Sequence, residues 1–112
     1  LDGGATALEE AVFHTDLDRL WFVPAGHSVQ PAAELLSSSR MPVLLDAIAG
    51  RVGHAVIVMD TPPLLPTVES RALTDVADQV LLVVKANSTP EGAVLQAVEQ
   101  LGEAKPVQLL LN

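Results

Sequence analysis

The chain contains no cysteine and no tyrosine, and its aromatic residues are one Trp and two Phe. Without cysteine there is no disulfide framework and no thiolate metal site, which is consistent with a cytoplasmic protein. Any core must be aliphatic, built from Val, Leu, Ile and Ala. Because 49% of the 112 residues are apolar, the composition is that of a folded chain, and the length corresponds to one domain or part of one.

Basic residues are also few, with six Lys and Arg against fourteen Asp and Glu, for a net charge of −8. Nucleic-acid binding requires clustered Lys and Arg, and here they are scattered singly, so we expect no nucleic-acid partner. The longest apolar runs, Ala55–Met59 and Val80–Val84, are far too short to span a bilayer. No basic amphipathic stretch and no signal peptide is visible, so no direct membrane insertion is expected.

Short apolar runs separated by helical patterns organise the chain. Four strands are expected, at Leu20–Val23, Ala55–Met59, Val80–Val84 and Val107–Leu111. The last three do not alternate polar with apolar residues, which predicts parallel strands with both faces covered by helices. The alternation of strands and helices predicts an α/β fold with a mostly parallel sheet and right-handed crossovers.

Helix start and stop signals lie between these runs. The clearest helix is expected after Thr89-Pro90, and Gly102 ends it. A second apolar helical face follows Ser39 and runs from Leu44 to Val52. Shorter helices are expected after Pro31, after Thr67 and around Leu8–Val12.

The chemistry of an open α/β sheet is expected beyond the carboxyl ends of its strands. Asp60 directly follows the Ala55–Met59 run and precedes Thr61-Pro62-Pro63. P-loop proteins place a carboxylate at such a strand end, where it holds hydrated Mg²⁺ beside the nucleotide phosphates. An Asp in this position can equally end the strand and cap the next turn. The Ala55–Met59 run followed by Asp60 does not decide between this structural role and a metal-binding role. Pro62 and Pro63 favour the metal-binding interpretation, because they keep the chain after Asp60 stiff and extended.

The stretch Asp60–Leu64 (DTPPL) resembles the Walker B segment of the bacterial tyrosine autokinases of exopolysaccharide and capsule synthesis. Other blocks resemble the same family, in order and at similar spacing: LWFVPAG at 20–26, PAAELL at 31–36, SRM at 39–41 and the run at 80–84. The VESR stretch at 68–71 and Thr89-Pro90 are closest to the branch associated with exosortase-type gene clusters and a chain-length-determinant membrane partner.

The resemblance implies a P-loop NTPase fold of the deviant-Walker type and an ATP-dependent protein-tyrosine autokinase that regulates exopolysaccharide synthesis and chain length. Asp60 matches the family's Walker B residue, which is catalytic and binds Mg²⁺. Asn112 matches the family's adenine-contacting Asn, since an amide offers a donor and an acceptor to a base; it reads equally well as a turn residue after a strand. The implied cofactors are therefore ATP and Mg²⁺.

The same resemblance implies partners and a location. The partners are a chain-length-determinant inner-membrane protein and further copies of the kinase. The implied location is cytoplasmic, peripheral to the inner membrane through that partner.

Several parts of the family pattern are absent from the sequence. There is no G-x-x-x-x-G-K-[ST] loop, no deviant Walker A′ strand and no tyrosine-rich tail, and Glu69 stands where the family usually has Asp. The chain also begins at Leu1 rather than Met and stops directly after an apolar run. We therefore predict that residues 1–112 are the carboxy-terminal half of the kinase domain, incomplete because the phosphate-loop strand is absent, and inactive alone.

In the family's sheet order the phosphate-loop strand lies between the Asp60 strand and the Val80–Val84 strand. Without it, those two strands either pair directly or leave two apolar edges open, which favours association.

Two other functions share parts of this pattern. A deviant-Walker ATPase of the septum-positioning or partition type has the Asp-ending strand but not the PAAELLSSSRM block at 31–41. A non-catalytic remnant that docks to the polysaccharide machinery is the third reading. His14, His27 and His54 show no metal-ligand spacing, and we predict none of them to be a ligand.

Overall fold

A computed structural model of the chain describes residues 8–27 and 32–112. Pro31, expected to open a short helix, lies outside the described residues. Residues 8–11 are helical, as expected for the first helix. The further elements are β1 (Phe13–His14), β2 (Trp21–Phe22), α2 (Ala32–Leu36), α3 (Arg40–Val52), α4 (Val68–Val76), β3 (Val80–Val84), α5 (Glu91–Leu101) and β4 (Val107–Leu111).

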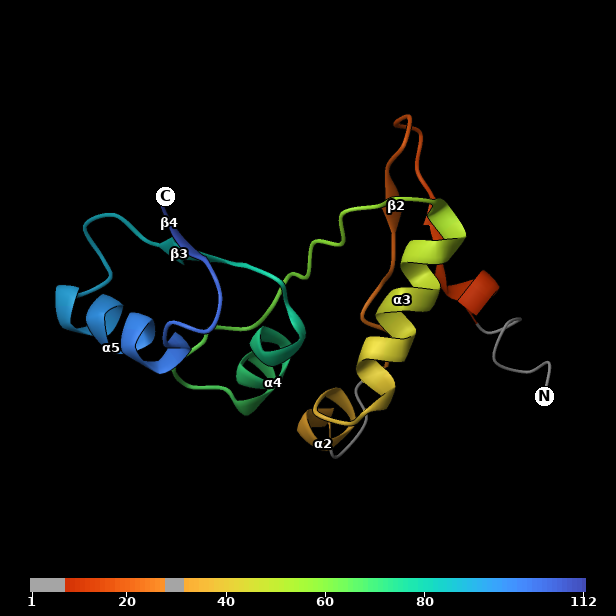
Figure 1. The fold of residues 1–112 in the computed structure, drawn as a ribbon. Helices are drawn as coiled ribbons and strands as arrows, with labels where there is room; N and C mark the ends of the chain where they lie inside the picture. The colour runs from red at the N-terminus through yellow and green to blue at the C-terminus, as the bar shows by residue number, and fades with distance from the viewer. Residues whose placement is uncertain (1–7, 28–31) are drawn as a thin grey trace.

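The last two predicted strands and their parallel pairing are confirmed. β3 pairs with β4 in register from Val80 opposite Val107 to Val84 opposite Leu111. Parallel neighbours need a crossover, and α5 supplies it, lying beside the two strands in Figure 1. Gly102 ends α5 as predicted: its φ is 67°, and its N–H donates to the Val98 carbonyl at 3.1 Å.

The first predicted strand is shorter than expected and lies in a different sheet. β2 covers only Trp21–Phe22 and pairs antiparallel with β1, which the sequence did not predict. The Thr15 hydroxyl donates to the Leu20 carbonyl at 2.9 Å and helps to close the turn between them. A local hairpin of this kind forms without any distant partner, so the expectation of a single, mostly parallel sheet is wrong for this strand.

The predicted strand at Ala55–Met59 is wrong for this structure. Residues 55–61 are free of regular secondary structure and belong to neither two-stranded sheet. Val56 and Val58 are 88% and 87% exposed. A strand depends on hydrogen bonds to a neighbour, and no described strand pairs with this segment. The described residues 55–59 therefore do not pair with β3, and association through the unpaired segment stays a prediction.

The helices do not cover both faces of the β3–β4 sheet, which corrects a second expectation. Leu81 and Val83 on one face of β3 are 56% and 55% exposed. Within the described residues the buried apolar side chains are only Ala72 and Ala97. The radius of gyration is 15.8 Å, against about 13 Å for a compact chain of this length.

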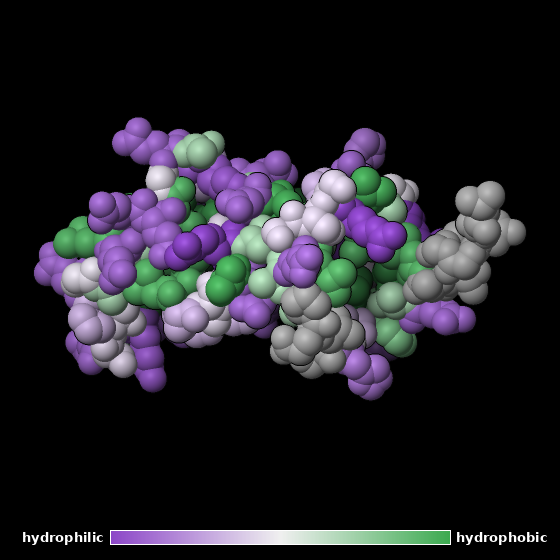
Figure 2. Space-filling view, turned by 90° about the horizontal axis from the view of Figure 1, so that it is seen from below, coloured by the Kyte–Doolittle hydropathy of each residue, from purple (hydrophilic) through white to green (hydrophobic). Residues whose placement is uncertain are grey.

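The overall arrangement explains this small core. Figure 1 shows α2, α3 and the β1–β2 hairpin grouped apart from α5, β3 and β4, with the extended segment running between the groups. Figure 2 shows hydrophobic patches reaching the surface among hydrophilic ones. The helices and strands of the protein are those of the predicted α/β class, but many of its aliphatic side chains are exposed. In the described ranges no helix has the length and apolar character needed to cross a membrane.

Candidate functional site

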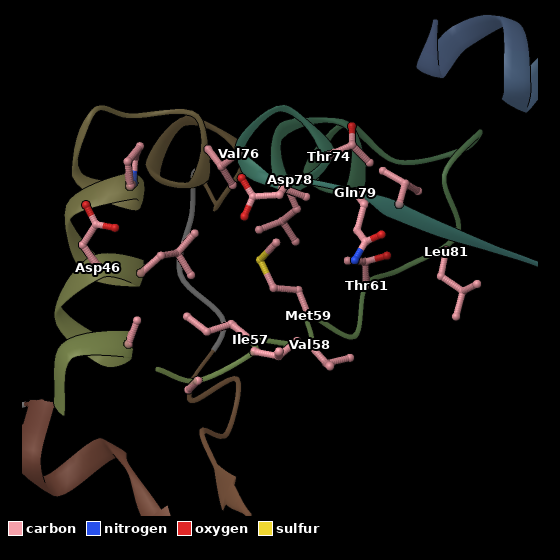
Figure 3. Close-up of a pocket in the computed structure, with 18 of the residues that line it drawn as sticks. Asp46, Ile57, Val58, Met59, Thr61, Thr74, Val76, Asp78, Gln79 and Leu81 are labelled. Carbon is pink, nitrogen blue, oxygen red and sulfur yellow. The ribbon is translucent and has the colours of Figure 1, made fainter. Parts of the chain in front are cut away.

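A slot of about 720 Å³ lies between the extended segment and the first residues of β3. Figure 3 shows α3 on one side of it, residues 57–61 below, and α4 with the start of β3 above and beside it. The slot is lined by Pro42, Leu45, Asp46, Ala49, Ala55, Val56, Ile57, Val58, Met59, Thr61, Leu73, Thr74, Val76, Ala77, Asp78, Gln79, Val80, Leu81 and Gln108. Most of these side chains are apolar, so the slot suits an apolar occupant.

Asp60 lies at the end of the extended segment with its side chain exposed. Its neighbours Met59 and Thr61 line the slot, and Asp60 itself does not. The described residues contain no group of three or more His, Cys, Asp or Glu side chains able to hold a metal. Mg²⁺ at a nucleotide usually takes one or two carboxylates and completes its shell with phosphates and water, and the exposed Asp60 carboxylate is an oxygen ligand of that kind.

The turn after Asp60 is held by hydroxyl groups. The Pro62 carbonyl accepts from the hydroxyls of Ser70 and Thr61, at 2.5 and 3.1 Å. The Pro63 carbonyl accepts from the Thr67 hydroxyl at 2.7 Å. Thr67 precedes α4 as predicted, but its side chain makes no capping bond to the helix backbone and turns back to this loop instead. We call Thr61, Thr67 and Ser70 the hydroxyl cluster.

Sequence reasoning missed the role of Ser70. The available signal was a second hydroxyl three residues after Thr67, in the first turn of the helix that follows the prolines. Glu69, beside it, is half-buried in the same turn.

Asn112 lies at the carboxyl end of β4, next to the loop that follows β3. Its N–H donates to the Val84 carbonyl at 2.9 Å, and its carbonyl accepts from the Ala86 N–H at 2.8 Å. These backbone bonds extend the parallel ladder and leave the side chain exposed. Neither Asn112 nor Asp60 lines the slot, so the slot does not bring the two predicted site residues together.

α4 connects the Asp60 loop to the sheet. At its amino end, Ser70 bonds the Pro62 carbonyl. At its carboxyl end, the partly buried Lys105 ammonium donates to the carbonyls of Thr74 and Ala77. Lys105 lies in the connection that leads into β4. One helix therefore sets how the Asp60 loop lies relative to β4.

Comparisons with known proteins return several bacterial kinases. The chain is 30% identical over 100 residues to tyrosine-protein kinase YwqD of Bacillus subtilis, covering 89% of this chain and 41% of that protein. It is 26% identical over 111 residues to tyrosine-protein kinase CpsD of Streptococcus agalactiae, covering 97% and 47%. Tyrosine-protein kinase ptk of Acinetobacter johnsonii is 28% identical over 86 residues, covering 77% and 12%.

The chain is thus similar to bacterial tyrosine-protein kinases over most of its length, which confirms the resemblance. It spans less than half the length of these curated relatives. No protein-family model and no solved structure matches it.

Proposed function

We propose that this chain supplies the Walker B side of the ATP site of a bacterial protein-tyrosine autokinase. The observation that carries the proposal is the similarity to curated tyrosine-protein kinases along 77–97% of the chain. ATP and Mg²⁺ are the cofactors that such an activity requires. In this proposal residues 1–112 correspond to the carboxy-terminal half of the kinase domain.

Asp60 is the proposed catalytic and metal-binding residue. Its exposed carboxylate follows an extended segment and precedes a stiff turn of two prolines, a combination that suits a ligand held in one orientation. Mg²⁺ bound there would neutralise charge on the phosphates during phosphoryl transfer. Within the chain itself, the role of Asp60 is to present one hard oxygen ligand.

The slot supports the fold that this function requires. Residues 55–59 line the slot and pair with no described strand, and β3, whose first residues Val80 and Leu81 also line it, pairs only with β4 among the described strands. An inserted strand with apolar side chains would satisfy both edges and cover Val56 and Val58. We assign this place to the phosphate-loop strand, because the sheet order that the resemblance implies puts that strand between the Asp60 segment and Val80–Val84, and more than half of each of these two relatives lies outside the matched region.

Asn112 is the proposed adenine contact. Its backbone is fixed by bonds to Val84 and Ala86, so its exposed amide is held at the carboxyl edge of the sheet. This is the edge where ligands of open α/β sheets bind.

The cellular role belongs to the same proposal. We assign the kinase to regulation of exopolysaccharide synthesis and chain length. Its proposed partners are a chain-length-determinant inner-membrane protein and further kinase subunits, and it is proposed to lie in the cytoplasm, peripheral to the inner membrane. Co-purification of the full-length gene product with that membrane protein is the test of this part.

The activity is tested by Asp60→Asn in the full-length gene product, with Asp18→Asn as the matched control at an exposed turn. Because this chain contains no tyrosine, phosphotyrosine is read on the remainder of the product or on an added tyrosine polymer. The expected loss for Asp60→Asn is on the order of 10²-fold or more in rate.

Unchanged phosphotyrosine formation in the Asp60 variant would refute the assignment. ATP hydrolysis without any phosphotyrosine, in the unmutated product, would favour the partition-type ATPase instead.

A further inference from the structure

Ser70 is the most deeply buried side chain in the described part of the protein, at 1% exposure. Its hydroxyl lies 2.5 Å from the Pro62 carbonyl, to which it donates, and 2.8 Å from the Thr67 hydroxyl. Burying a hydroxyl without a partner is unfavourable, so a buried serine is held firmly to the groups it bonds. Ser70 therefore ties the first turn of α4 to the loop after Asp60.

The Ser70 hydroxyl bonds the loop through a carbonyl group, the kind of hydrogen-bonding group that the two prolines offer. Pro62 and Pro63 carry no N–H, so only their carbonyls are available for hydrogen bonds. Of the two hydroxyls on the Pro62 carbonyl, Thr61 is its sequence neighbour, whereas Ser70 lies eight residues away in α4. Only the Ser70 bond fixes Pro62 relative to a helix.

Asp60 has no comparable support on its other side. Residues 55–59 belong to no sheet in the described structure, and Val58 is almost fully exposed. Two peptide units separate Asp60 from Pro62, a span of at most about 7.6 Å, so a shift of Pro62 is passed directly to Asp60.

We propose that Ser70 is a positioning residue for the Asp60 carboxylate, acting through the Pro62 carbonyl. This inference rests on the proposed function of Asp60 as the magnesium ligand. Groups that orient a metal ligand without touching the metal commonly change metal affinity or activity by 10-fold or more when they are removed. Ser70 fits that role through its burial, its bond to Pro62 and its place in α4.

The first test uses the nucleotide-free, full-length gene product and measures amide hydrogen exchange. Ser70→Ala is expected to speed exchange at Thr61, Leu64 and Leu65, while exchange in α5 stays unchanged. Ser37→Ala is the matched control, because its hydroxyl also donates to a backbone carbonyl, that of Ala33 at 2.8 Å, but far along the chain from Asp60. Faster exchange in the Ser70 variant alone is the expected result.

The second test measures the Mg²⁺ concentration for half-maximal phosphotyrosine formation at saturating ATP. Ser70→Ala is expected to raise it roughly 10-fold, and Ser70→Thr, which keeps the hydroxyl, to restore part of that loss. A merely structural role would lower the thermal midpoint and the active fraction but leave this Mg²⁺ concentration unchanged.

The outcomes separate the two claims. If Asp60→Asn abolishes activity while Ser70→Ala changes neither the loop exchange nor the Mg²⁺ requirement, the positioning role is overturned and the proposed function stands. If Asp60→Asn is fully active, the proposed function itself fails. If Ser70→Ala does not fold, Ser70→Cys takes its place, since a thiol fills the site but is only a weak donor to the Pro62 carbonyl; unchanged loop exchange and Mg²⁺ requirement in that variant overturn the inference.

Discussion

The Lys105 ammonium donates a hydrogen bond to the Ala77 carbonyl at 2.9 Å, joining residues 28 positions apart. It also donates to the Thr74 carbonyl, so one cation satisfies two carbonyls at the carboxyl end of α4. A cation in this position also complements the helix dipole. Because Ser70 bonds the Asp60 loop at the other end of the helix, α4 is fastened at both ends, once to the loop and once to the approach to β4.

Removing the Lys105 ammonium should destabilise the protein. In Lys105→Met the apolar stem is retained and the two carbonyls lose their donor, at an expected cost of about 1–3 kcal/mol. Lys85→Met, at an exposed site, is the matched control and should leave stability nearly unchanged. Chemical denaturation of the full-length gene product checks both; equal stability of the two variants would contradict this role of Lys105.

Replacing each of two glycines of the α5 region with alanine should change the stability of the protein in opposite directions. Gly102 has φ 67° and ψ −162°, a region essentially restricted to glycine, and a Cβ there would meet no atom within 4 Å, so the cost of Gly102→Ala is purely that of the backbone, about 1–3 kcal/mol. Gly92 is the second residue of α5, and its added Cβ also meets nothing within 4 Å, so Gly92→Ala should stabilise by about 0.4–1 kcal/mol by lowering the conformational entropy of the unfolded chain. Shifts of the unfolding midpoint in the same direction would contradict this prediction.

The chain of residues 1–112 by itself should associate through the slot. Its open edges and the exposed Val56 and Val58 are the groups that an added strand would cover. Light scattering should show a molecular mass that rises with concentration, and Val56→Lys with Val58→Lys should suppress the rise. Val43→Lys, at another exposed valine on α3, is the control and should not. A chain that stays monomeric to high concentration would argue against open, associating edges.

Replacing Asn112 should affect nucleotide binding rather than turnover. In the full-length gene product, Asn112→Ala should raise the KM for ATP roughly fivefold, the equivalent of about 1 kcal/mol, with kcat little changed. Asn87→Gly is the matched control: it removes a nearby exposed amide, and glycine readily adopts the φ of 58° found there. A loss confined to kcat would place Asn112 outside the adenine contact.

Local patterns in the sequence were sufficient for the elements whose partners lie in the same chain. The apolar runs at 80–84 and 107–111, with the helix between Pro90 and Gly102, were predicted and form a parallel pair with its crossover. The DTPP segment likewise pointed to Asp60, and the LWFVPAG and PAAELLSSSRM blocks at 20–26 and 31–41 pointed to the kinase family, because each of these patterns is made by neighbouring residues. The β1–β2 hairpin was missed, since two-residue strands carry too little periodicity to be recognised.

Tertiary structure alone decided what surrounds Asp60. The run at 55–59 has the composition of a buried strand, yet it is exposed, because a strand exists only where another strand accepts its hydrogen bonds. The burial of Ser70 and its bond to Pro62 were equally invisible in the sequence, which does not show which of several hydroxyls in a helix turn faces a loop eight residues away. Spacing and resemblance singled out Asp60 as the candidate ligand, whereas the packing of α4 against its loop determines how the segment that follows Asp60 is held.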